Sequence, residues 1–259
     1  MSLEFNRFFK SKSLASTYKP TLAKCLLDLA DYNDDEGSQW VVLNEGTYTV
    51  DLHFIAARFL RYYHPLRFTF KLRQQATKQR IAIYEKLEKY VDELGTKSTP
   101  SKKEMCLDKF KELREETIRH DALKRQVLPK LLNDCNVYEY VIGSKSITIK
   151  KTIVDYMRDN KNILESALNY MIAGYLEKCN SSPNISTKLE EKIQRTKLTT
   201  KNLQEIIDLQ KSCCFYCENK GNSFAQDHFL PWNYLFQTEQ YNMVPACQNC
   251  NSSKNDKLT

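Results

Sequence analysis

Two Cys-x-x-Cys pairs constrain the fold of this chain more than any other sequence feature. Cys214 and Cys217 form one pair, and Cys247 and Cys250 form the other. Each pair has the spacing of a metal-chelating turn, and four thiolates satisfy the tetrahedral coordination that Zn²⁺ prefers. The sequence therefore predicts that residues 218–246 leave the first turn and return to the second around one zinc ion. From the cysteines alone, a purely structural zinc ribbon is favoured over redox or catalytic uses.

The distribution of the cysteines indicates metal binding rather than a disulfide framework. The chain has nine cysteines, an odd number, and five of them fall within residues 213–250. Such a cluster in a long chain is typical of a metal site in a reducing compartment. Cys213 competes with Cys214 as a ligand but would lengthen the first spacing, so we interpret it as a buried neighbour. The remaining cysteines are interpreted as buried thiols: Cys25, Cys106, Cys135 and Cys179.

Composition argues against a membrane protein. The chain of 259 residues is 41% hydrophobic, enough for one large core or two modest ones. The mean hydropathy is −0.58, and the sequence contains no apolar run of about 18 residues. The start, MSLEFNRFFK, lacks the apolar segment of a signal peptide. We therefore expect a cytoplasmic protein that does not associate with membranes.

The formal net charge of +7 is unevenly distributed along the chain. Residues 211–259 contain four basic and four acidic residues, so the whole excess lies in residues 1–210. Attraction for a polyanion is therefore expected outside the cysteine-rich segment. Many helical proteins carry a similar excess, so an ordinary solvated surface is the alternative interpretation.

Residue periodicity predicts a mainly α-helical N-terminal region with two short β-hairpins. Residues 40–50 alternate β-forming residues around Asn44-Glu45-Gly46, and residues 137–151 have Gly143 in their turn. A break is expected near Pro129. Helical patterns occur after Pro20 over residues 21–30, over 51–64, over 74–95, from Pro100 to about His120, and over 162–179.

A stretch rich in Asn, Ser and Pro, residues 180–187, marks the expected domain boundary. A helix capped by Thr199 or Thr200 then leads to the cysteine-rich segment. We predict a mostly helical domain over residues 1–180, a linker and connecting helix over 181–210, and a small C-terminal domain over 211–259.

Polar residues between and after the cysteine pairs form an ordered pattern. The segment contains C-x-x-C, then D-H-x-x-P from Asp227 to Pro231, then N-x-V-P-A-C-x-x-C-N-x-x-K from Asn242 to Lys254. Over residues 211–259 this pattern resembles the HNH endonuclease family, which includes bacterial restriction and defence proteins. The resemblance implies a zinc-supported ββα-metal domain, in which two short strands and a helix hold one divalent cation. Asn251 stands at the position of the family's final His and retains an oxygen ligand.

Hydrolysis of a phosphodiester requires a base that activates water and a cation that stabilises the developing charge. His228 suits the general base, because an imidazole accepts a proton near neutral pH. Asp227 is a hard oxygen ligand suited to Mg²⁺. The resemblance implies that Asn251 completes the magnesium site and that Asn242 steadies the loop carrying His228.

Two further expectations concern the Asp-His pair. Adjacent strand residues face opposite ways, so we expect a bend or loop at Asp227 and His228 rather than a regular strand. A structural histidine or an additional zinc ligand are alternative roles for His228.

The remaining residues of the segment have supporting roles in this hypothesis. Lys254 either contacts a phosphate or is a solvated lysine. The chain ends at Thr259, five residues after Lys254, so we expect either a short last helix or a truncated C-terminus. A strand-strand-helix unit has little apolar core, and zinc can replace that core. Local packing is favoured over base stacking for the apolar residues of the loop, which are Phe229, Trp232, Tyr234, Leu235 and Phe236.

A basic stretch without acidic residues lies in the N-terminal region, between Arg58 and Arg80. Such a run attracts phosphate groups, and the aromatic residues within it could stack on bases. Packing of those aromatic rings inside the protein is the alternative. The candidate nucleic-acid-binding residues are Arg58, Arg61, Arg67, Lys71, Arg73, Lys78 and Arg80, with Lys145, Lys150 and Lys151 as a weaker group.

The sequence thus predicts a Mg²⁺-dependent endonuclease that hydrolyses DNA, expected to be double-stranded, in restriction or defence against foreign DNA. Its helical N-terminal domain would position the DNA. A structure-selective, mobile-element or RNA nuclease are alternatives, as is a non-catalytic zinc-dependent DNA-binding module. A palindromic target would imply a homodimer.

Overall fold

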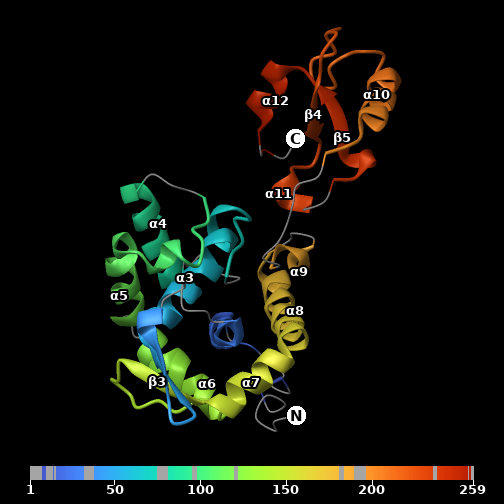
Figure 1. Cartoon of the computed structure of the whole chain (residues 1–259). Helices are drawn as coiled ribbons and strands as arrows, with labels where there is room; N and C mark the ends of the chain where they lie inside the picture. Colours follow the sequence, from blue (N-terminus) through green and yellow to red (C-terminus); the bar gives the residue numbers. More distant parts are fainter. Residues whose placement is uncertain are drawn as a thin grey trace. The chain divides into compact units, whose positions relative to one another are not determined.

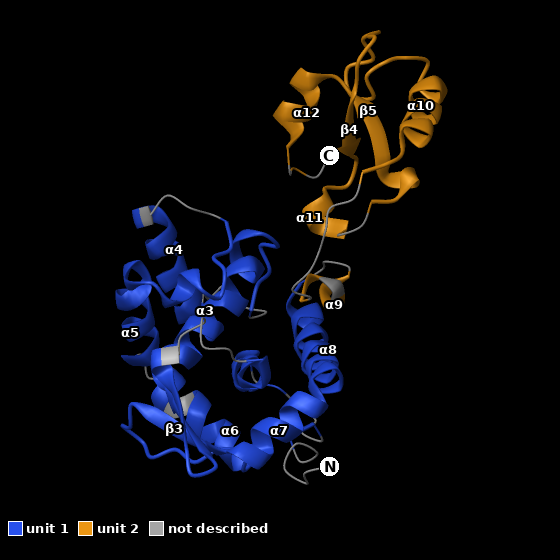
Figure 2. Cartoon of the chain, in the orientation of Figure 1, with its two compact units in different colours: residues 1–181 blue, residues 182–259 orange. Residues whose placement is uncertain are grey.

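The computed structural model describes residues 8–9, 14, 16–31, 38–74, 81–94, 98–119, 122–180, 184–189, 197–235, 238–255 and 257. The chain divides into two compact units, residues 1–181 and residues 182–259 (Figure 2). Each unit has its own helices and strands.

The first unit is mainly helical and contains one small sheet (Figure 1). Short 3-10 turns and one π-helical segment, Ala122–Val127, connect its longer elements. The helices are α2 (Tyr18–Leu27), α3 (Leu52–Phe68), α4 (Ala82–Leu94), α5 (Lys111–Arg119), α6 (Leu128–Asp134), α7 (Lys151–Asp159) and α8 (Lys161–Cys179), and the strands are β1 (Val41–Asn44), β2 (Thr47–Asp51) and β3 (Ser146–Lys150).

Helix α2 is the centre of the first unit. It begins at Tyr18 with Pro20 in its first turn, as the sequence predicts, and it buries eight of its ten residues. Helices α3, α6 and α8 pack around it. Leu22, Ile55 and Leu176 are fully buried in these helices. Burial of such side chains stabilises the unit by about 1.5–3 kcal/mol each.

The predicted first hairpin is confirmed. Strands β1 and β2 pair antiparallel, and Asn44 lies opposite Thr47 across a two-residue turn. Glu45 and Gly46 both have positive φ, 46° and 77°, which is the backbone of a type I′ turn and matches the right-handed twist of the strands.

The predicted second hairpin forms only in part. Residues 146–150 form β3, but β3 pairs antiparallel with β2, so the sheet has the order β1-β2-β3. The other expected arm contributes only an isolated bridge from Glu139 to Thr148. Gly143 does lie in the intervening turn, with φ of 95°. Most of the pairing of β3 is therefore with the distant strand β2, and its neighbour in sequence adds a single bridge.

The charged helix expected from Pro100 to about His120 is also shorter than predicted. Two 3-10 turns, Glu104–Cys106 and Asp108–Phe110, precede α5, which begins at Lys111. Arg114 on α5 donates to the carbonyl oxygens of Met105 and Leu107, so its side chain bonds carbonyl groups of these turns. His120 and Gly95 lie outside the described residues.

The break expected near Pro129 is a change of helix type at that point. The π-helical segment ends at Val127 and α6 begins at Leu128, with Pro129 in the first turn of α6. Helix α7, at residues 151–159, was not predicted.

The second unit is a two-stranded sheet with short helices. Part of the predicted linker, residues 180–187, forms helix α9, and Thr199 caps α10 by accepting a hydrogen bond from the Asn202 N–H group. The elements are α9 (Ile185–Lys188), α10 (Thr200–Leu209), β4 (Ala225–His228), α11 (Trp232–Leu235), β5 (Met243–Ala246) and α12 (Gln248–Lys254).

Strands β4 and β5 pair antiparallel, and α12 packs against β4 while α10 packs against β5. The predicted class, mainly helical with short antiparallel strands and a C-terminal strand-strand-helix unit, is confirmed. Within the described residues, no helix is long and apolar enough to cross a membrane.

Candidate functional site

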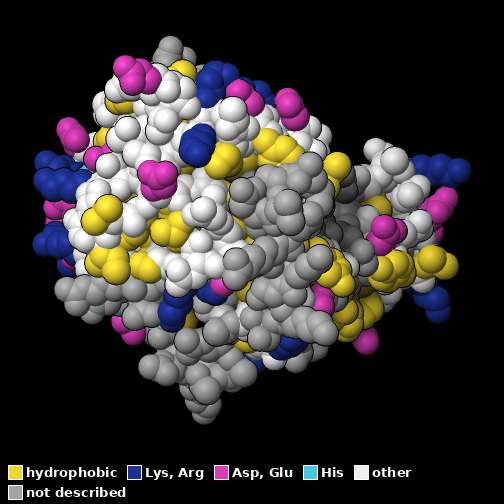
Figure 3. All heavy atoms as spheres, turned by 90° about the horizontal axis from the view of Figure 1, so that it is seen from below, with side chains coloured by type: hydrophobic (Ala, Val, Ile, Leu, Met, Phe, Trp, Pro, Cys, Tyr) yellow, Lys and Arg dark blue, Asp and Glu magenta, His cyan; other side chains and the backbone are white. Residues whose placement is uncertain are grey.

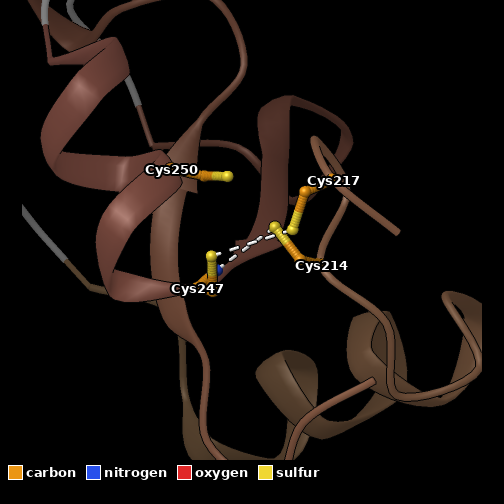
Figure 4. A group of neighbouring side chains, drawn as sticks. All are labelled: Cys214, Cys217, Cys247 and Cys250. Atoms are coloured by element: carbon orange, nitrogen blue, oxygen red, sulfur yellow. Dashed lines mark hydrogen bonds between the residues drawn. The ribbon is translucent and has the colours of Figure 1, made fainter. Parts of the chain in front are cut away.

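Four cysteine side chains converge in the second unit, as Figure 4 shows. Cys214 and Cys217 come from a turn, whereas Cys247 caps α12 and Cys250 lies in its first turn. Their sulfur atoms all lie within 4.8 Å of one another, and the Cys217 and Cys247 sulfurs are 3.9 Å apart. Zinc–sulfur bonds of about 2.3 Å imply sulfur–sulfur distances of about 3.8 Å in a tetrahedron. The cluster therefore fits a zinc ion.

Backbone N–H groups stabilise the thiolate form of Cys214, which is the form that binds a cation. Burial opposes ionisation of this thiol, but hydrogen bonds from the N–H groups of Cys247, Cys217 and Tyr216 outweigh burial and lower the pKa of Cys214 to about 6. The Cys247 N–H group lies 3.3 Å from the Cys214 sulfur. This bond joins the two cysteine pairs directly, and the thiolate it favours is the form that binds zinc.

Two minor cysteine predictions are wrong. Cys213 is only partly buried, and its sulfur faces the Lys211 carbonyl group rather than the cluster. Cys106 is also only partly buried, whereas Cys25, Cys135 and Cys179 are buried as predicted.

The expected bend at Asp227 and His228 is absent, because both residues belong to β4. Asp227 pairs with Val244 and His228 with Met243. Successive side chains of a strand point to opposite faces, and these two have different neighbours. Asp227 bonds with Tyr216 and Lys254, whereas the His228 imidazole Nε2 atom lies 3.3 Å from the Thr238 hydroxyl.

The Asp227 carboxylate is buried and held at one oxygen. The Tyr216 hydroxyl donates to Oδ2 at 2.6 Å, and the Lys254 Nζ atom lies 3.1 Å from the same oxygen. Burial, followed by the hydrogen bond to the carboxylate, raises the pKa of Tyr216 far above its usual value. Tyr216 therefore stays protonated and remains a donor to Asp227 at neutral pH.

Lys254 is not a solvated lysine, contrary to one of its two expected roles. The residue is 7% exposed, and besides approaching Asp227 its ammonium group donates to the His228 carbonyl oxygen at 2.7 Å. A buried ammonium group needs such partners to offset the loss of water. Lys254 thus ties the last turn of α12 to the end of β4.

Asn242 grips the loop that follows His228. Its side-chain oxygen accepts from the Leu230 N–H group at 2.8 Å, and its side-chain nitrogen donates to the Leu230 carbonyl at 2.9 Å. The Asn242 carbonyl also accepts from the Phe229 N–H group at 2.8 Å. These three bonds fix the backbone directly after His228.

Asn251 lies on the same side of α12 as Lys254, because residues three apart in a helix are neighbours on its surface. Lys254 points towards β4, so Asn251 is placed towards β4 as well. Asn251 is half-buried, and its side chain makes no hydrogen bond with the residues that the structure describes. Its amide oxygen is available to a ligand.

The apolar residues of the loop after β4 are partly exposed to solvent. The structure describes Phe229, Trp232, Tyr234 and Leu235, all partly buried, and Phe236 lies outside the described residues. The Phe229 ring packs edge-on against that of Phe215, with centroids 5.5 Å apart. This contact supports local packing as the role of Phe229.

The basic stretch of the first unit is largely engaged within the protein. Arg58 is 2% exposed and faces the Asp28 carboxylate, with Nε to Oδ2 at 3.7 Å, so its predicted contact with DNA is wrong. Arg67 bonds with Glu88 on α4, and Arg61 is half-buried. Of the described members, only Lys71 and Arg73 are exposed.

The remaining candidate residues for nucleic-acid contact have different surroundings. Lys78 and Arg80 lie outside the described residues. Tyr63 is fully buried and Tyr62 donates to Asp28, so these rings pack inside the protein. Lys145, Lys150 and Lys151 are exposed. On the face shown in Figure 3, acidic and basic side chains are interspersed among the described residues.

Sequence reasoning missed Tyr216. Its only sequence signal is its place between the two cysteines of the first pair, where any residue is compatible with the spacing. The hydrogen bond to Asp227 depends on β4 lying against that turn, and no local pattern reports this.

The comparison with protein families agrees with the geometry. The family described as HNH endonuclease matches residues 214–257, which include both cysteine pairs, β4, β5 and α12. No curated protein and no solved structure matches the chain.

Proposed function

Since residues 214–257 form an HNH endonuclease domain, we propose that this protein is a divalent-cation-dependent endonuclease that hydrolyses phosphodiester bonds of double-stranded DNA. The observation that carries the proposal is that the matched segment is a strand-strand-helix unit clamped by a four-cysteine cluster. Of the polar residues of the family pattern, Asp227, His228, Asn251 and Lys254 lie on these elements and Asn242 lies directly before β5, and all are buried or half-buried.

Asp227 and Asn251 are the residues that would hold a magnesium ion. The Asp227 Oδ1 atom and the Asn251 amide oxygen have no hydrogen-bond partner among the described residues, and both are hard oxygen donors. When bound, the cation supplies a positive charge that stabilises the phosphate and the leaving oxygen. This donor set suits Mg²⁺ or another hard divalent cation.

His228 is the proposed general base, which takes a proton from the attacking water. The nearby Thr238 hydroxyl and the Lys254 bond to the His228 carbonyl orient the residue. Asp227 and His228 are consecutive in β4, so the scissile phosphate must lie across the end of this strand for both side chains to act on it. Asn242 fixes the loop that follows His228 through its two side-chain bonds to Leu230.

The zinc site would replace the apolar core that this small unit lacks. It would join the turn before β4, which carries Tyr216, to the start of α12, whose last turn carries Lys254, and both of these residues contact Asp227. We therefore assign zinc a structural role and magnesium the chemistry.

The first unit is proposed to position the DNA. It carries a charge excess of +6, from 30 basic and 24 acidic residues in positions 1–181, out of +7 for the chain. Lys71 and Arg73 are the exposed members of the basic stretch that support this role. Restriction or another defence against foreign DNA is the proposed setting, and the cytoplasm is the proposed location.

Plasmid cleavage tests the proposal directly. Zinc-loaded protein should convert supercoiled plasmid to nicked or linear forms with Mg²⁺ and lose this activity when Mg²⁺ is withheld. His228→Ala and Asp227→Asn should abolish cleavage while retaining zinc. Gln248→Ala, an exposed position on α12, is the matched control and should cut normally.

The same experiment separates the alternative functions. Plasmid that is shifted on a gel but left intact by both wild type and His228→Ala would contradict the enzyme and favour a DNA-binding module. Cleavage of RNA but not of plasmid would make the protein an RNA nuclease. Mapping the cut ends then distinguishes nicking from double-strand cleavage.

A further inference from the structure

The Asp227 carboxylate is held from both halves of the cysteine cluster. Tyr216 lies between Cys214 and Cys217 in the first turn, and Lys254 lies one helical turn after Cys250 on α12. Both side chains reach the same carboxylate oxygen, Oδ2. The segments that carry the four sulfur atoms thus also carry the two donors to Asp227.

This convergence leaves the two oxygens of Asp227 unequal. Oδ2 has two donors, whereas Oδ1 has no hydrogen-bond partner among the described residues. A carboxylate restrained at one oxygen cannot rotate freely, so Oδ1 is presented in one direction. That arrangement suits a carboxylate that binds a cation through a single oxygen.

Lys254 is held in place independently of Asp227. Its ammonium group also donates to the His228 carbonyl oxygen at 2.7 Å, and the residue is buried. A cation arriving at Oδ1 therefore has no need to displace it. Tyr216 is neutral, so its removal changes the restraint on the carboxylate without changing the charge of the site.

We propose that Tyr216, together with Lys254, is a positioning residue that orients the Asp227 carboxylate for a divalent cation and transmits the geometry of the zinc site to it. This inference rests on the proposed function, because it concerns the same cation. Groups that orient a metal ligand typically contribute about tenfold to a hundredfold to metal affinity.

Binding of Mn²⁺ to zinc-loaded protein, followed by the electron paramagnetic resonance signal of free Mn²⁺, tests the proposal apart from activity. Tyr216→Phe should retain the zinc content of the wild type and bind Mn²⁺ at least about tenfold more weakly. The Mn²⁺ concentration for half-maximal cleavage should rise by the same factor, with cleavage recovering at higher Mn²⁺. Tyr241→Phe is the matched control, since Tyr241 is 76% exposed in the same unit, and it should behave as the wild type.

Each other outcome overturns the inference. Unchanged Mn²⁺ affinity in Tyr216→Phe would show that the hydroxyl does not position Asp227. Loss of zinc from Tyr216→Phe would make Tyr216 a structural residue of the cysteine turn. If the wild type itself neither bound Mn²⁺ through Asp227 nor cut DNA, the proposed function would fail and the inference with it, so the two failures are distinguishable.

Discussion

The two units of this protein differ in how many hydrophobic side chains they bury. In the first unit, α2 alone buries eight residues and packs mainly against α3, α6 and α8. In the second unit, the buried hydrophobic residues among those described are Ile185, Cys214, Met243 and Ala246. Its other buried side chains include the polar and charged groups of the site. The comparison teaches that the second unit has few buried hydrophobic residues among those described, and a metal held by its four-cysteine cluster is the proposed substitute for an apolar core.

Each unit also contains a buried carboxylate beside a buried cation, and the two carboxylates differ. Both oxygens of Asp28 in the first unit are engaged, with Tyr62 and Lys102 at hydrogen-bond distance and Arg58 at 3.7 Å. Asp227 in the second unit is engaged at Oδ2 and leaves Oδ1 to a ligand. A carboxylate whose two oxygens both have partners in the protein has a structural role. A carboxylate with one oxygen lacking such a partner can bind a cation through that oxygen.

The largest effect should follow loss of zinc, because structural zinc contributes on the order of 10 kcal/mol to such units. Cys250→Ser should lose zinc and unfold the second unit while the first unit keeps its own unfolding transition. Metal content and calorimetry measure both effects. Cys213→Ser, next to the cluster but outside it, should keep zinc. Full zinc content and unchanged unfolding in Cys250→Ser would contradict a role of the cluster in folding.

The reverse experiment destabilises the first unit and leaves the second unit unchanged. Asp28→Asn removes a carboxylate that the buried Arg58 faces, which should lower the free energy of unfolding of this unit by about 3 kcal/mol. The zinc content should not change. The control is Asp155→Asn, whose carboxylate pairs with Lys151 and Arg158 at the surface and which should leave stability unchanged. Equal free energies of unfolding for Asp28→Asn and Asp155→Asn in chemical denaturation would contradict a greater stabilising role for the buried carboxylate.

A smaller effect is expected from Asn242→Ala in the second unit. The variant loses both side-chain bonds to Leu230, which should cost about 2 kcal/mol and slow cleavage by loosening the loop after His228. Zinc should remain bound. Gln240→Ala, at an exposed position two residues earlier, serves as the control in the same unfolding and cleavage assays. A cleavage rate equal to that of the wild type would argue against a role for the loop.

The smallest effect concerns acid. Burial, and then the charge of Arg61, lower the pKa of His64 in the first unit from 6.5 to about 4. Below pH 6.5 the His64 imidazole is protonated in the unfolded chain but stays neutral in the folded unit. The contribution of neutral His64 to the free energy of unfolding is therefore fully present above pH 6.5 and is lost as the pH falls towards 4. The loss between pH 7 and pH 5 should be on the order of 1 kcal/mol. Denaturation of His64→Asn at both pH values should show a smaller difference than the wild type, and an equal difference would exclude His64 as the cause.

Local sequence patterns were sufficient to predict those parts of the fold whose stabilising interactions lie between residues close together in the sequence. The spacing of Cys214 to Cys217 and of Cys247 to Cys250 predicted two chelating turns, and Glu45-Gly46 predicted a tight hairpin turn. Periodicity located α2, α3 and α8. In each case the determining interactions lie within a few residues.

Predictions failed where a residue's partner is distant along the chain. The sequence could not indicate that β3 would pair with β2, or that Arg58 would face Asp28 rather than solvent. A charged residue in a helical pattern is ordinarily exposed, and only the carboxylate brought to it by folding permits burial.

The sequence by itself therefore determined the kind of chemistry this protein can support: four thiolates for zinc, an Asp-His pair and two asparagines in the order of the HNH pattern. Only the tertiary structure decided how those groups are used. It buried Lys254, brought Tyr216 to the Asp227 carboxylate, and left one oxygen of that carboxylate for a ligand. The reason is physical, since residue type sets which bonds a group can form, but packing of distant segments sets which partner it meets and how much water is lost.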